Sequence, residues 1–377
     1  MKKVLIAIDS FKGSLTSAQA SEAASEAVKS VFSACRTEIC NVSDGGEGML
    51  STLLSGGGYR KITVCAADPL MRQRETFYLL SEDNVCYIEL AEICGLPLVP
   101  EWMRNPMKTT TYGVGEVISD ALSRGCREFV IGLGGSATND AGIGALYALG
   151  FRFYDDLGNS VYLGGEALES VCSIDVSGAN PLLEEARFTL ACDVLAPFAG
   201  ESGAAFTFAP QKGADKAMVV RLDEAMKKFA GLIYNVTGKE ILELPRAGAA
   251  GGISGAFYAL LNAELKSGTE LLLKAVNFKE KLNGSDLVIT GEGRIDKQTA
   301  MGKLPCGVLN TASSEGIPVI ALAGDVVWSD NVRSFGFADI LSVTPEGMAL
   351  AEAMKPEIAK RNIISALSAF LRSNSVY

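Results

Sequence analysis

Apolar runs recur along the chain, and each is followed by a polar or glycine-rich loop and then by a helical pattern. Near-continuous apolar residues predict strands at 3–8, 128–131, 286–290 and 318–322, because a strand covered on both faces is apolar throughout. After the first of these strands, apolar residues keep helical spacing to about residue 32. This alternation predicts an α/β fold built on a parallel sheet.

Two segments interrupt this alternation. Residues 61–100 have the pattern of strands joined by hairpin turns, and residues 150–268 mix strands, turns and helices. We therefore predict a doubly wound, Rossmann-like parallel-sheet domain with a second, discontinuous α/β domain inserted into it. The first domain is predicted to contain residues 1–60, 105–149 and 276–377, and the inserted mixed α/β domain residues 61–104 and 150–275.

A glycine-rich stretch, GLGGSATNDAGIG, occupies Gly132–Gly144 between a predicted strand and a predicted helix. Glycines allow a ligand to approach the backbone, and the N–H groups at a helix start favour an anion. The polar groups of this stretch suit a phosphate, a sugar-like hydroxyl or Mg²⁺. A tight turn capped by Asn139 or Asp140 is one alternative. A dinucleotide-binding turn is another, because GLGGSA fits G-x-G-x-x-A after a strand.

Three further loops follow predicted strands in the same way. They read DSFKGS at 9–14, SDGGEG at 43–48 and GEGRID at 291–296. Ligands of open α/β sheets bind beyond the carboxyl ends of the strands, so we expect these loops and the Gly132 loop to meet at one edge of one sheet. Another small-residue loop, AGAAGGISG at 247–255, fits either close helix packing or anion binding equally well.

The absence of histidine among 377 residues narrows the chemistry. It excludes Ser–His and Cys–His nucleophile pairs, HExxH zinc sites and histidine proton relays. Acid–base steps must then use Asp, Glu, Lys, Tyr or Cys. Phosphoryl transfer tolerates this restriction, because it depends mainly on positioning and electrostatics, with a carboxylate often acting as base.

Charge and cysteine content limit the partners and the compartment. The net charge of −10 argues against a general nucleic-acid binder. The 9 cysteines are scattered without a CxxC pair, which suits reduced core residues. No uncharged apolar run is long enough to span a membrane, and the short apolar start meets Asp9 at once, so we interpret it as a strand. We expect a cytoplasmic protein whose partners are small molecules, without nucleic acid or membrane.

Seven blocks of the sequence resemble the bacterial glycerate kinase family and run in family order over nearly the whole chain. They are DSFKG at 9–13, SDGGEG at 43–48, RNPMKTTTYGVGE at 104–116, IGLGGSATNDAGIG at 131–144, FAPQKGA at 208–214, AGAAGGISGA at 247–256 and TGEGRID at 290–296. The resemblance implies a two-domain α/β kinase that phosphorylates D-glycerate with ATP and Mg²⁺ in an interdomain cleft. The implied product of in-line transfer is 2-phosphoglycerate, with 3-phosphoglycerate as the alternative.

The chain departs from the family pattern at a few positions. Family members usually have a glycine where Ala141 stands and a proline where Ile8 stands. They usually have asparagine at the position of Ala196 and serine at the position of Cys94. These departures leave the carboxylates and cations of the motifs untouched.

Phosphoryl transfer needs cations on the phosphates, a carboxylate-held metal, and a carboxylate that orients or deprotonates the attacking hydroxyl. We favour Lys12 and Arg294 as the cations, because each lies in a glycine-bearing loop at a strand end. As the base we favour Asp193, which follows an apolar strand; helix capping is its alternative role.

Oxygen ligands suit Mg²⁺, and the candidates are Asp44, Glu292 and Asp296. The carboxylate of glycerate needs its own donor, which could be a backbone N–H group near Ser136 or the side chain of Arg104. The other candidates for binding substrate or nucleotide are Asp9, Ser10, Gly45, Gly46, Gly134, Gly135, Thr138, Asn139, Gly251 and Gly252.

Two functions of other classes compete with the kinase. A dinucleotide-dependent oxidoreductase would bind NADH, but Ser, Thr, Asn and Asp crowd the start of the helix after Gly132, where a dinucleotide turn prefers small apolar residues. A non-catalytic sensor of a nucleotide or sugar acid would bind its ligand without turnover. The number of carboxylates in the loops favours catalysis over sensing.

Overall fold

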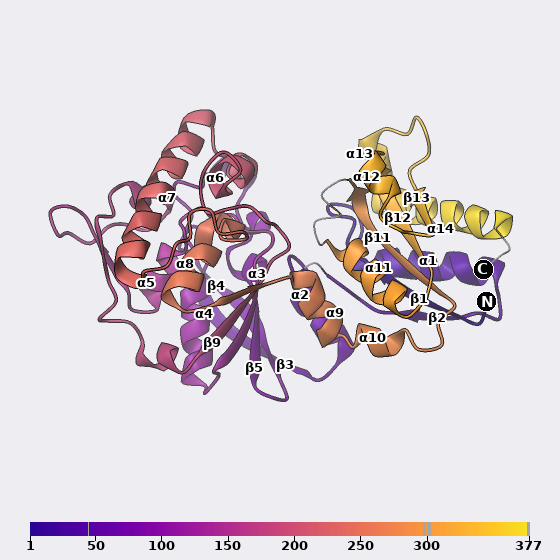
Figure 1. Cartoon of the computed structure of the whole chain (residues 1–377), viewed down its shortest axis with the longest axis horizontal. Helices are drawn as coiled ribbons and strands as arrows, with labels where there is room; N and C mark the ends of the chain where they lie inside the picture. Colours follow the sequence, from indigo (N-terminus) through magenta and orange to yellow (C-terminus); the bar gives the residue numbers. More distant parts are fainter. Residues whose placement is uncertain (44, 297–298, 300–302, 375–377) are drawn as a thin grey trace. The chain divides into compact units, whose positions relative to one another are not determined.

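The computed structural model describes residues 1–43, 45–296, 299 and 303–374, apart from the side chains of residues 331 and 333 (Figure 1). The chain forms two compact units. The terminal unit contains Met1–Asp44, Ser51–Gly56 and Thr269–Tyr377. The central unit contains Gly45–Leu50 and Gly57–Gly268. Asp44, a candidate metal ligand, lies outside the described residues.

A five-stranded parallel sheet organises the terminal unit. Its strands are β1 (Lys3–Ile8), β2 (Arg36–Ile39), β11 (Leu287–Ile295), β12 (Val319–Val326) and β13 (Asp339–Ser342). The spatial order is β13-β12-β11-β1-β2, and every pair is parallel. Counted along the chain this order is 2-1-3-4-5, which is a doubly wound topology with its reversal between β1 and β11. The predicted α/β fold class is therefore confirmed.

Helices cover both faces of this sheet, which explains the near-continuous apolar run of β1. Val4, Ile6 and Ile8 belong to the core that contains residues of α1 (Ser17–Val31) and α14 (Pro356–Ser373), whereas Leu5 and Ala7 belong to the core on the other face. The remaining helices of this unit's segments are α9 (Gly268–Ala275), α10 (Phe278–Lys281), α11 (Leu304–Ser314), α12 (Asp330–Arg333) and α13 (Leu350–Ala353). A strand of parallel sheet buried on both faces has no polar side to display.

The central unit is built on a six-stranded mixed sheet. Its strands are β3 (Tyr59–Ala67), β4 (Gln73–Ser81), β5 (Val85–Glu89), β6 (Glu128–Gly132), β9 (Arg187–Ala191) and β10 (Glu264–Lys266). The order is β10-β9-β6-β5-β4-β3. β3, β4 and β5 pair antiparallel, whereas β5, β6, β9 and β10 pair parallel. Two short strands, β7 (Arg152–Tyr154) and β8 (Ser173–Asp175), form a separate hairpin.

The prediction that residues 105–149 belong to the Rossmann-like domain is wrong. β6, which lies in this segment, pairs with β5 and β9 in the six-stranded sheet, and the whole segment belongs to the central unit. Residues 269–275, predicted in the inserted domain, belong to the terminal unit. An apolar strand followed by a helix has the same local pattern in either sheet, so only the long-range pairing decides which sheet it joins.

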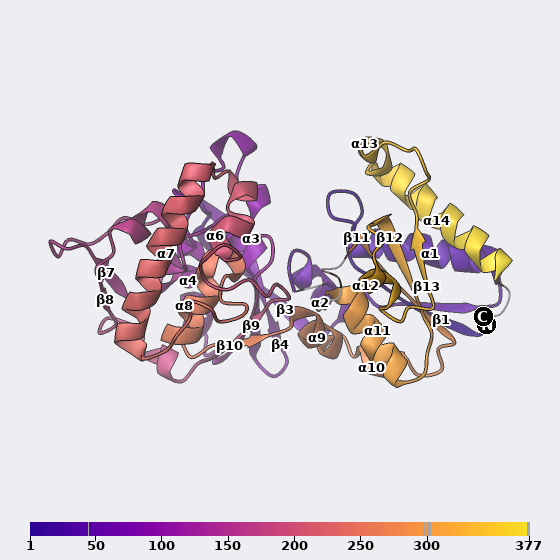
Figure 2. The same ribbon diagram turned by 45° about the horizontal axis from the view of Figure 1, so that its top comes forward.

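Helices surround the parallel part of the central sheet. The α-helices are α2 (Met49–Gly56), whose first residues belong to this unit, α3 (Leu90–Cys94), α4 (Tyr112–Ser123), α5 (Ile143–Ala148), α6 (Ala204–Phe208), α7 (Lys216–Thr237) and α8 (Ile253–Leu260). The 3₁₀ turns are η1 (Leu96–Leu98), η2 (Glu101–Met103), η3 (Gly165–Glu169), η4 (Pro181–Glu184), η5 (Pro210–Lys212) and η6 (Ala249–Gly252). α7 packs beside β8 (Figure 2).

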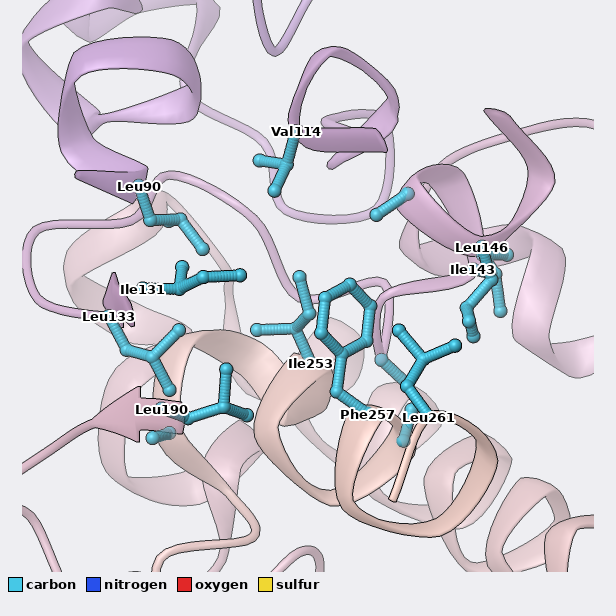
Figure 3. Packing of buried hydrophobic residues seen from close by; sticks show 14 of the residues in the cluster. Leu90, Val114, Ile131, Leu133, Ile143, Leu146, Leu190, Ile253, Phe257 and Leu261 are labelled. Carbon is cyan, nitrogen blue, oxygen red and sulfur yellow. The ribbon is translucent and has the colours of Figure 1, made fainter. Parts of the chain in front are cut away.

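The core of the central unit lies directly beneath the glycine-rich loop. Leu133, the second residue of that loop, is buried among Ile131 of β6, Leu190 of β9 and Ile253 of α8 (Figure 3). The loop therefore starts from a rigid base. Among the described residues, no helix combines the length and apolar character that a membrane crossing requires.

Candidate functional site

A pocket of about 310 Å³ opens in the terminal unit, beyond the carboxyl ends of β1, β11 and β12. Its polar lining includes Asp9, Ser10, Lys12, Glu292 and Arg294. Asp9, Ser10 and Lys12 follow β1, whereas Glu292 and Arg294 lie at the carboxyl end of β11, which continues to Ile295 through most of the segment predicted as a loop. The strand order reverses between these two strands. Doubly wound sheets bind ligands at this point, because the loops of the two neighbouring strands diverge to opposite faces there.

The two predicted cations, Lys12 and Arg294, both line this pocket. The side chain of Arg294 is 62% exposed, and its Nε lies 3.6 Å from a carboxylate oxygen of Asp325 and 3.9 Å from one of Asp296. Both ion pairs are long and solvated, so they hold the guanidinium weakly. An incoming phosphate could therefore compete for Arg294.

Glu292 is the candidate metal ligand that lines the pocket. It is buried; the Thr299 hydroxyl donates to its Oε1 at 2.7 Å, and Nζ of Lys303 lies 3.4 Å from its Oε2. In the part of the chain that the structure describes, no three His, Cys, Asp or Glu side chains come together as a metal cage. This donor set fits Mg²⁺, which is usually held by one or two carboxylates together with substrate phosphates.

A second group of predicted residues lies in the central unit. The ends of β5, β6 and β9 are in register, with Glu89 opposite Gly132 and Gly132 opposite Ala191. The Gly132 loop therefore extends from the six-stranded sheet, and the Asp9 and Gly291 loops from the five-stranded one. The expectation that these loops share one sheet edge is wrong, because β6 belongs to the other sheet.

The predicted glycines of the central unit permit backbone-to-backbone packing. A Cβ on Gly134 would lie 2.4 Å from the Cα of Gly46, and a Cβ on Gly132 would lie 2.4 Å from the carbonyl oxygen of Gly45. Gly135 has a φ of +75° and its carbonyl accepts from Leu96. Only glycine allows two loops to approach so closely, and this packing fixes the shape of the Gly132 loop.

Gly251 and Gly252 are explained by close packing. Both are buried with positive φ. A Cβ on Gly251 would lie 2.2 Å from the carbonyl oxygen of Thr138, and Gly251 in turn accepts from the N–H of Ala141. Of the two roles left open for the 247–255 loop, the structure shows helix and loop packing against the Gly132 loop.

Asp140 organises the helix start inside the Gly132 loop. It is fully buried and accepts hydrogen bonds from the hydroxyls of Thr110 and Thr111 and from the N–H groups of Thr111, Gly142 and Gly144, at 2.8–3.3 Å. Burial raises the pKa of this carboxyl, and the hydrogen bonds counteract the rise. Asp140 therefore has the capping role given above as an alternative.

Ala141 shows the cost of one departure from the family pattern. Its φ is +49°, in the left-handed region, and it is fully buried. This conformation costs an alanine roughly 1–2 kcal/mol and a glycine almost nothing. The hydrogen bonds that Asp140 accepts from Gly142 and Gly144 hold the turn in which the alanine lies.

Lys212 contacts the polar half of the same loop and was not among the predicted site residues. Its side chain is buried, and its Nζ donates to Oγ of Ser136 at 2.8 Å and to the carbonyl of Thr138 at 2.6 Å. Burial lowers its pKa to about 8, and the groups of Cys94 and Asp140 oppose that shift. Cys94, at a position where family members usually have serine, is therefore one of the groups around the buried amine of Lys212.

Two more groups point to a polar ligand near this loop. Nε of Arg104 is buried without a hydrogen-bond partner among the described residues, and the carbonyl of Arg104 packs against Gly213, the neighbour of Lys212. Oδ1 of Asn139 is also buried and unpartnered within the described ranges. Buried polar atoms without partners are rare in native proteins.

Asp193, the predicted base, follows β9 in the central unit and is half-buried. The Ser267 hydroxyl donates to its Oδ1 at 2.7 Å. Next to it, Nε of Arg246 donates to the carbonyl of Cys192 at 3.1 Å, and Arg246 has a φ of +72°. A non-glycine residue in this conformation beside a candidate base marks a constrained, site-like position.

Glu89 is a third side chain that the sequence analysis did not select. It is buried at the end of β5, and its carboxylate accepts from the N–H groups of Gly48 at 2.9 Å and Leu50 at 3.0 Å. It thereby caps the start of α2 and fixes the 45–50 segment. Burial raises its pKa to about 7, and those two hydrogen bonds limit the rise.

This shift predicts a pH-dependent loss of stability. Folded Glu89 holds its proton more tightly than an unfolded glutamate with its pKa of 4.5, so stability falls as pH rises from about 4.5 to about 7. The free energy of unfolding is measured in urea at several pH values over this range. As pH rises, the Glu89→Gln variant is expected to lose about 3 kcal/mol less of this free energy than the parent chain does. The exposed Glu101→Gln control should follow the parent. Parallel curves for the parent and Glu89→Gln would contradict the assignment.

The missed residues differ in how visible they were in the sequence. Lys212 stands in the FAPQKGA block and Arg246 directly precedes AGAAGGISGA, so both lie at recognised motifs. Glu89 ends an apolar strand and carries no motif. Position at a strand end is the signal that could have identified it.

Comparison with known proteins identifies the family of the chain. The model of the glycerate kinase family matches residues 4–373. A glycerate kinase of Halalkalibacterium halodurans is 41% identical over 96% of this chain and 97% of its own length. A glycerate 2-kinase of Escherichia coli K12 is 38% identical over 98% and 99%. A crystal structure assigned as glycerate kinase 2 of Salmonella typhimurium LT2 superposes with a TM-score of 0.81 at 37% identity, over all of both chains. The chain therefore belongs to the glycerate kinase family of enzymes.

Proposed function

We propose that the protein transfers the γ-phosphoryl group of ATP to the 2-hydroxyl of D-glycerate, with Mg²⁺, by in-line displacement. The observation that carries this proposal is the meeting of Lys12, Arg294 and Glu292 in one pocket at the carboxyl ends of β1 and β11, in a chain of the glycerate kinase family. The name of the E. coli relative, glycerate 2-kinase, supports the 2-hydroxyl.

In the terminal unit, Lys12 and Arg294 are proposed to hold the phosphates of ATP. Their charges would offset the negative charge on the transferring group, which is the main requirement of phosphoryl transfer. The hydroxyl group of Ser10 is an additional donor, whereas its N–H already donates to Oδ1 of Asp9 at 2.7 Å. Glu292, which lines the pocket, and Asp296 are the proposed Mg²⁺ ligands, and Asp9 is a further carboxylate of the pocket lining. Bound Mg²⁺ would neutralise charge on the phosphate oxygens.

In the central unit, Asp193 is proposed as the base. Its carboxylate would accept the proton of the 2-hydroxyl while that oxygen bonds to the phosphorus and ADP leaves. The hydroxyl of Ser267 already orients this carboxylate. Arg104, Ser136 and the buried amine of Lys212 are proposed to bind the glycerate carboxylate, because an anion would pair with the unpartnered Nε of Arg104.

The contacts of the Gly132 loop support binding of the glycerate carboxylate more than binding of a dinucleotide. Its glycines pack against the Gly45–Gly46 backbone and against residues 94–96, and its Ser136 contacts a lysine. These features support an anion-binding loop whose conformation is fixed by the neighbouring backbone segments. The predicted interdomain cleft and the cytoplasmic location stay predictions.

A turnover assay separates the three candidate functions. With ATP, Mg²⁺ and D-glycerate, we expect ADP release that depends on all three components. Release of NADH from NAD⁺ and glycerate, without ADP, would identify an oxidoreductase. Binding of ATP or glycerate by calorimetry without either product would identify a sensor, and both outcomes would overturn the proposal.

A further inference from the structure

We propose that the pocket of the terminal unit binds the adenosine part of ATP, with the base against an apolar wall formed by Val343, Leu350, Ala353 and Met354. This proposal rests on the proposed kinase function and extends it, because it assigns the nucleotide to one unit of the chain. The pocket lies wholly within the terminal unit, so its geometry is that of one compact body.

The pocket has two chemically different ends. Lys12, Glu292 and Arg294 make one end charged, as described above. The other end is lined by apolar side chains that come from the loop after β13, from α13 and from the start of α14. A nucleotide has the same division, because a flat, largely apolar base is joined through a ribose to a highly charged phosphate chain.

The apolar end has uncovered surface. Leu350 is 72% exposed and Met354 is 37% exposed, although both line a cavity. Val343 and Ala353 behind them are buried. A methionine and a leucine on the rim of a pocket suit the face of an aromatic ring, since thioether and aliphatic groups pack well against such faces.

Two polar side chains lie in this apolar end. Thr344 follows Val343, and Asn362 of α14 is buried in the lining. The Nδ2 of Asn362 has Sδ of Met348, a weak acceptor, at 3.4 Å. A carboxamide offers one donor and one acceptor side by side, which is the pattern that pairs with the edge of adenine. Ligand pockets commonly combine an apolar lining with a few such groups.

The charged segments and the apolar wall adjoin one another. A Cβ on Gly293 would lie 3.6 Å from the N atom of Lys12, in ordinary contact without overlap. Gly13 has a φ of +78° and lies close to Met354, which brings the Lys12 loop against the apolar wall. One ligand could therefore touch both ends, whereas the three-carbon acid glycerate has no apolar face to place on the wall.

Filling the apolar end tests this assignment in the full chain. Ala353→Phe is expected to raise the KM for ATP and the calorimetric Kd for ADP by about tenfold or more, because the added ring would occupy the space that the base is proposed to fill. The KM for D-glycerate should stay within about twofold. Leu157→Ala, which removes an exposed side chain of the central unit, is the control and should change none of these values.

A second variant covers the case that Ala353→Phe does not fold. Met354→Ala, at a partly exposed side chain, should weaken ADP binding by about threefold to tenfold without changing the KM for D-glycerate. Unchanged ADP binding in both folded variants, or a changed KM for glycerate alone, would overturn the assignment. If the parent chain binds ADP but phosphorylates no glycerate, the proposed function fails, while the effect of the variants on ADP binding still decides this inference.

Discussion

Replacing Asp193 with asparagine is expected to lower kcat by about 10²- to 10⁴-fold, the usual contribution of a general base. The change keeps the size of the side chain and its ability to accept the Ser267 hydrogen bond. It removes the negative charge and with it the ability to take a proton from the substrate hydroxyl. Steady-state kinetics with ATP and D-glycerate measure the effect, and thermal unfolding should be unchanged.

Two companions make the Asp193 result interpretable. Ser267→Ala removes the hydroxyl that orients the carboxylate, so a smaller loss of about tenfold is expected, with a normal pH profile. Asp156→Asn changes an exposed carboxyl of the same unit and should have no effect. Near-normal turnover by Asp193→Asn would rule out this aspartate as the base.

Replacing Arg294 with methionine is expected to lower kcat/KM for ATP by about 10³-fold, in the range of cationic side chains that stabilise transferring phosphoryl groups. Because the side chain is 62% exposed and its ion pairs are 3.6 and 3.9 Å long, its loss should leave the free energy of unfolding within about 0.5 kcal/mol of the parent value. Arg294→Met is therefore expected to lower catalytic activity without lowering the stability of the fold.

Arg187 provides the matched control for Arg294. It is an 83% exposed arginine that lies 3.7 Å from Glu128 in the central unit, so Arg187→Met removes a comparable surface ion pair. We expect no change in kcat/KM for this control. Equal kinetics for Arg294→Met and Arg187→Met would contradict the placing of Arg294 on the phosphates.

The terminal unit was predictable because its signals are local. β1 and the first residues of β11 are apolar, as strands covered on both faces must be. Lys12 follows β1, and Glu292 and Arg294 lie in the last residues of β11. Lys12, Glu292 and Arg294 therefore reached one pocket as the strand-end rule predicts. Their shared location needed only the knowledge that β1 and β11 are parallel strands of one sheet.

The assignment of the Gly132 loop to that sheet could not be corrected from the sequence. β6 has the same apolar pattern as β1, and its membership of the other sheet depends on pairing with β5, some forty residues earlier in the chain. The same limit applies to the glycines at Gly45 and Gly134, which resemble ligand contacts but pack against neighbouring backbone. Local patterns identify such elements but not their partners.

Cations that make long-range hydrogen bonds were the least predictable part of the candidate site. Lys212 reaches Ser136 across 76 positions of the chain, and Arg246 reaches Cys192 across 54. A lysine or arginine in a sequence is by default a solvated residue. Only the folded structure reveals that Lys212 is buried against the loop that carries Ser136 and that the half-buried Arg246 donates next to Asp193.

The most direct test of the proposed activity is a proton-coupled phosphorus NMR spectrum of the product formed from ATP, Mg²⁺ and D-glycerate. In 2-phosphoglycerate the phosphorus couples to the single proton on C2, so we predict a doublet. In 3-phosphoglycerate it couples to two protons and would give a triplet, which would contradict the 2-hydroxyl as acceptor. Absence of any new phosphate-ester signal, with the folded chain present, would contradict the kinase function itself.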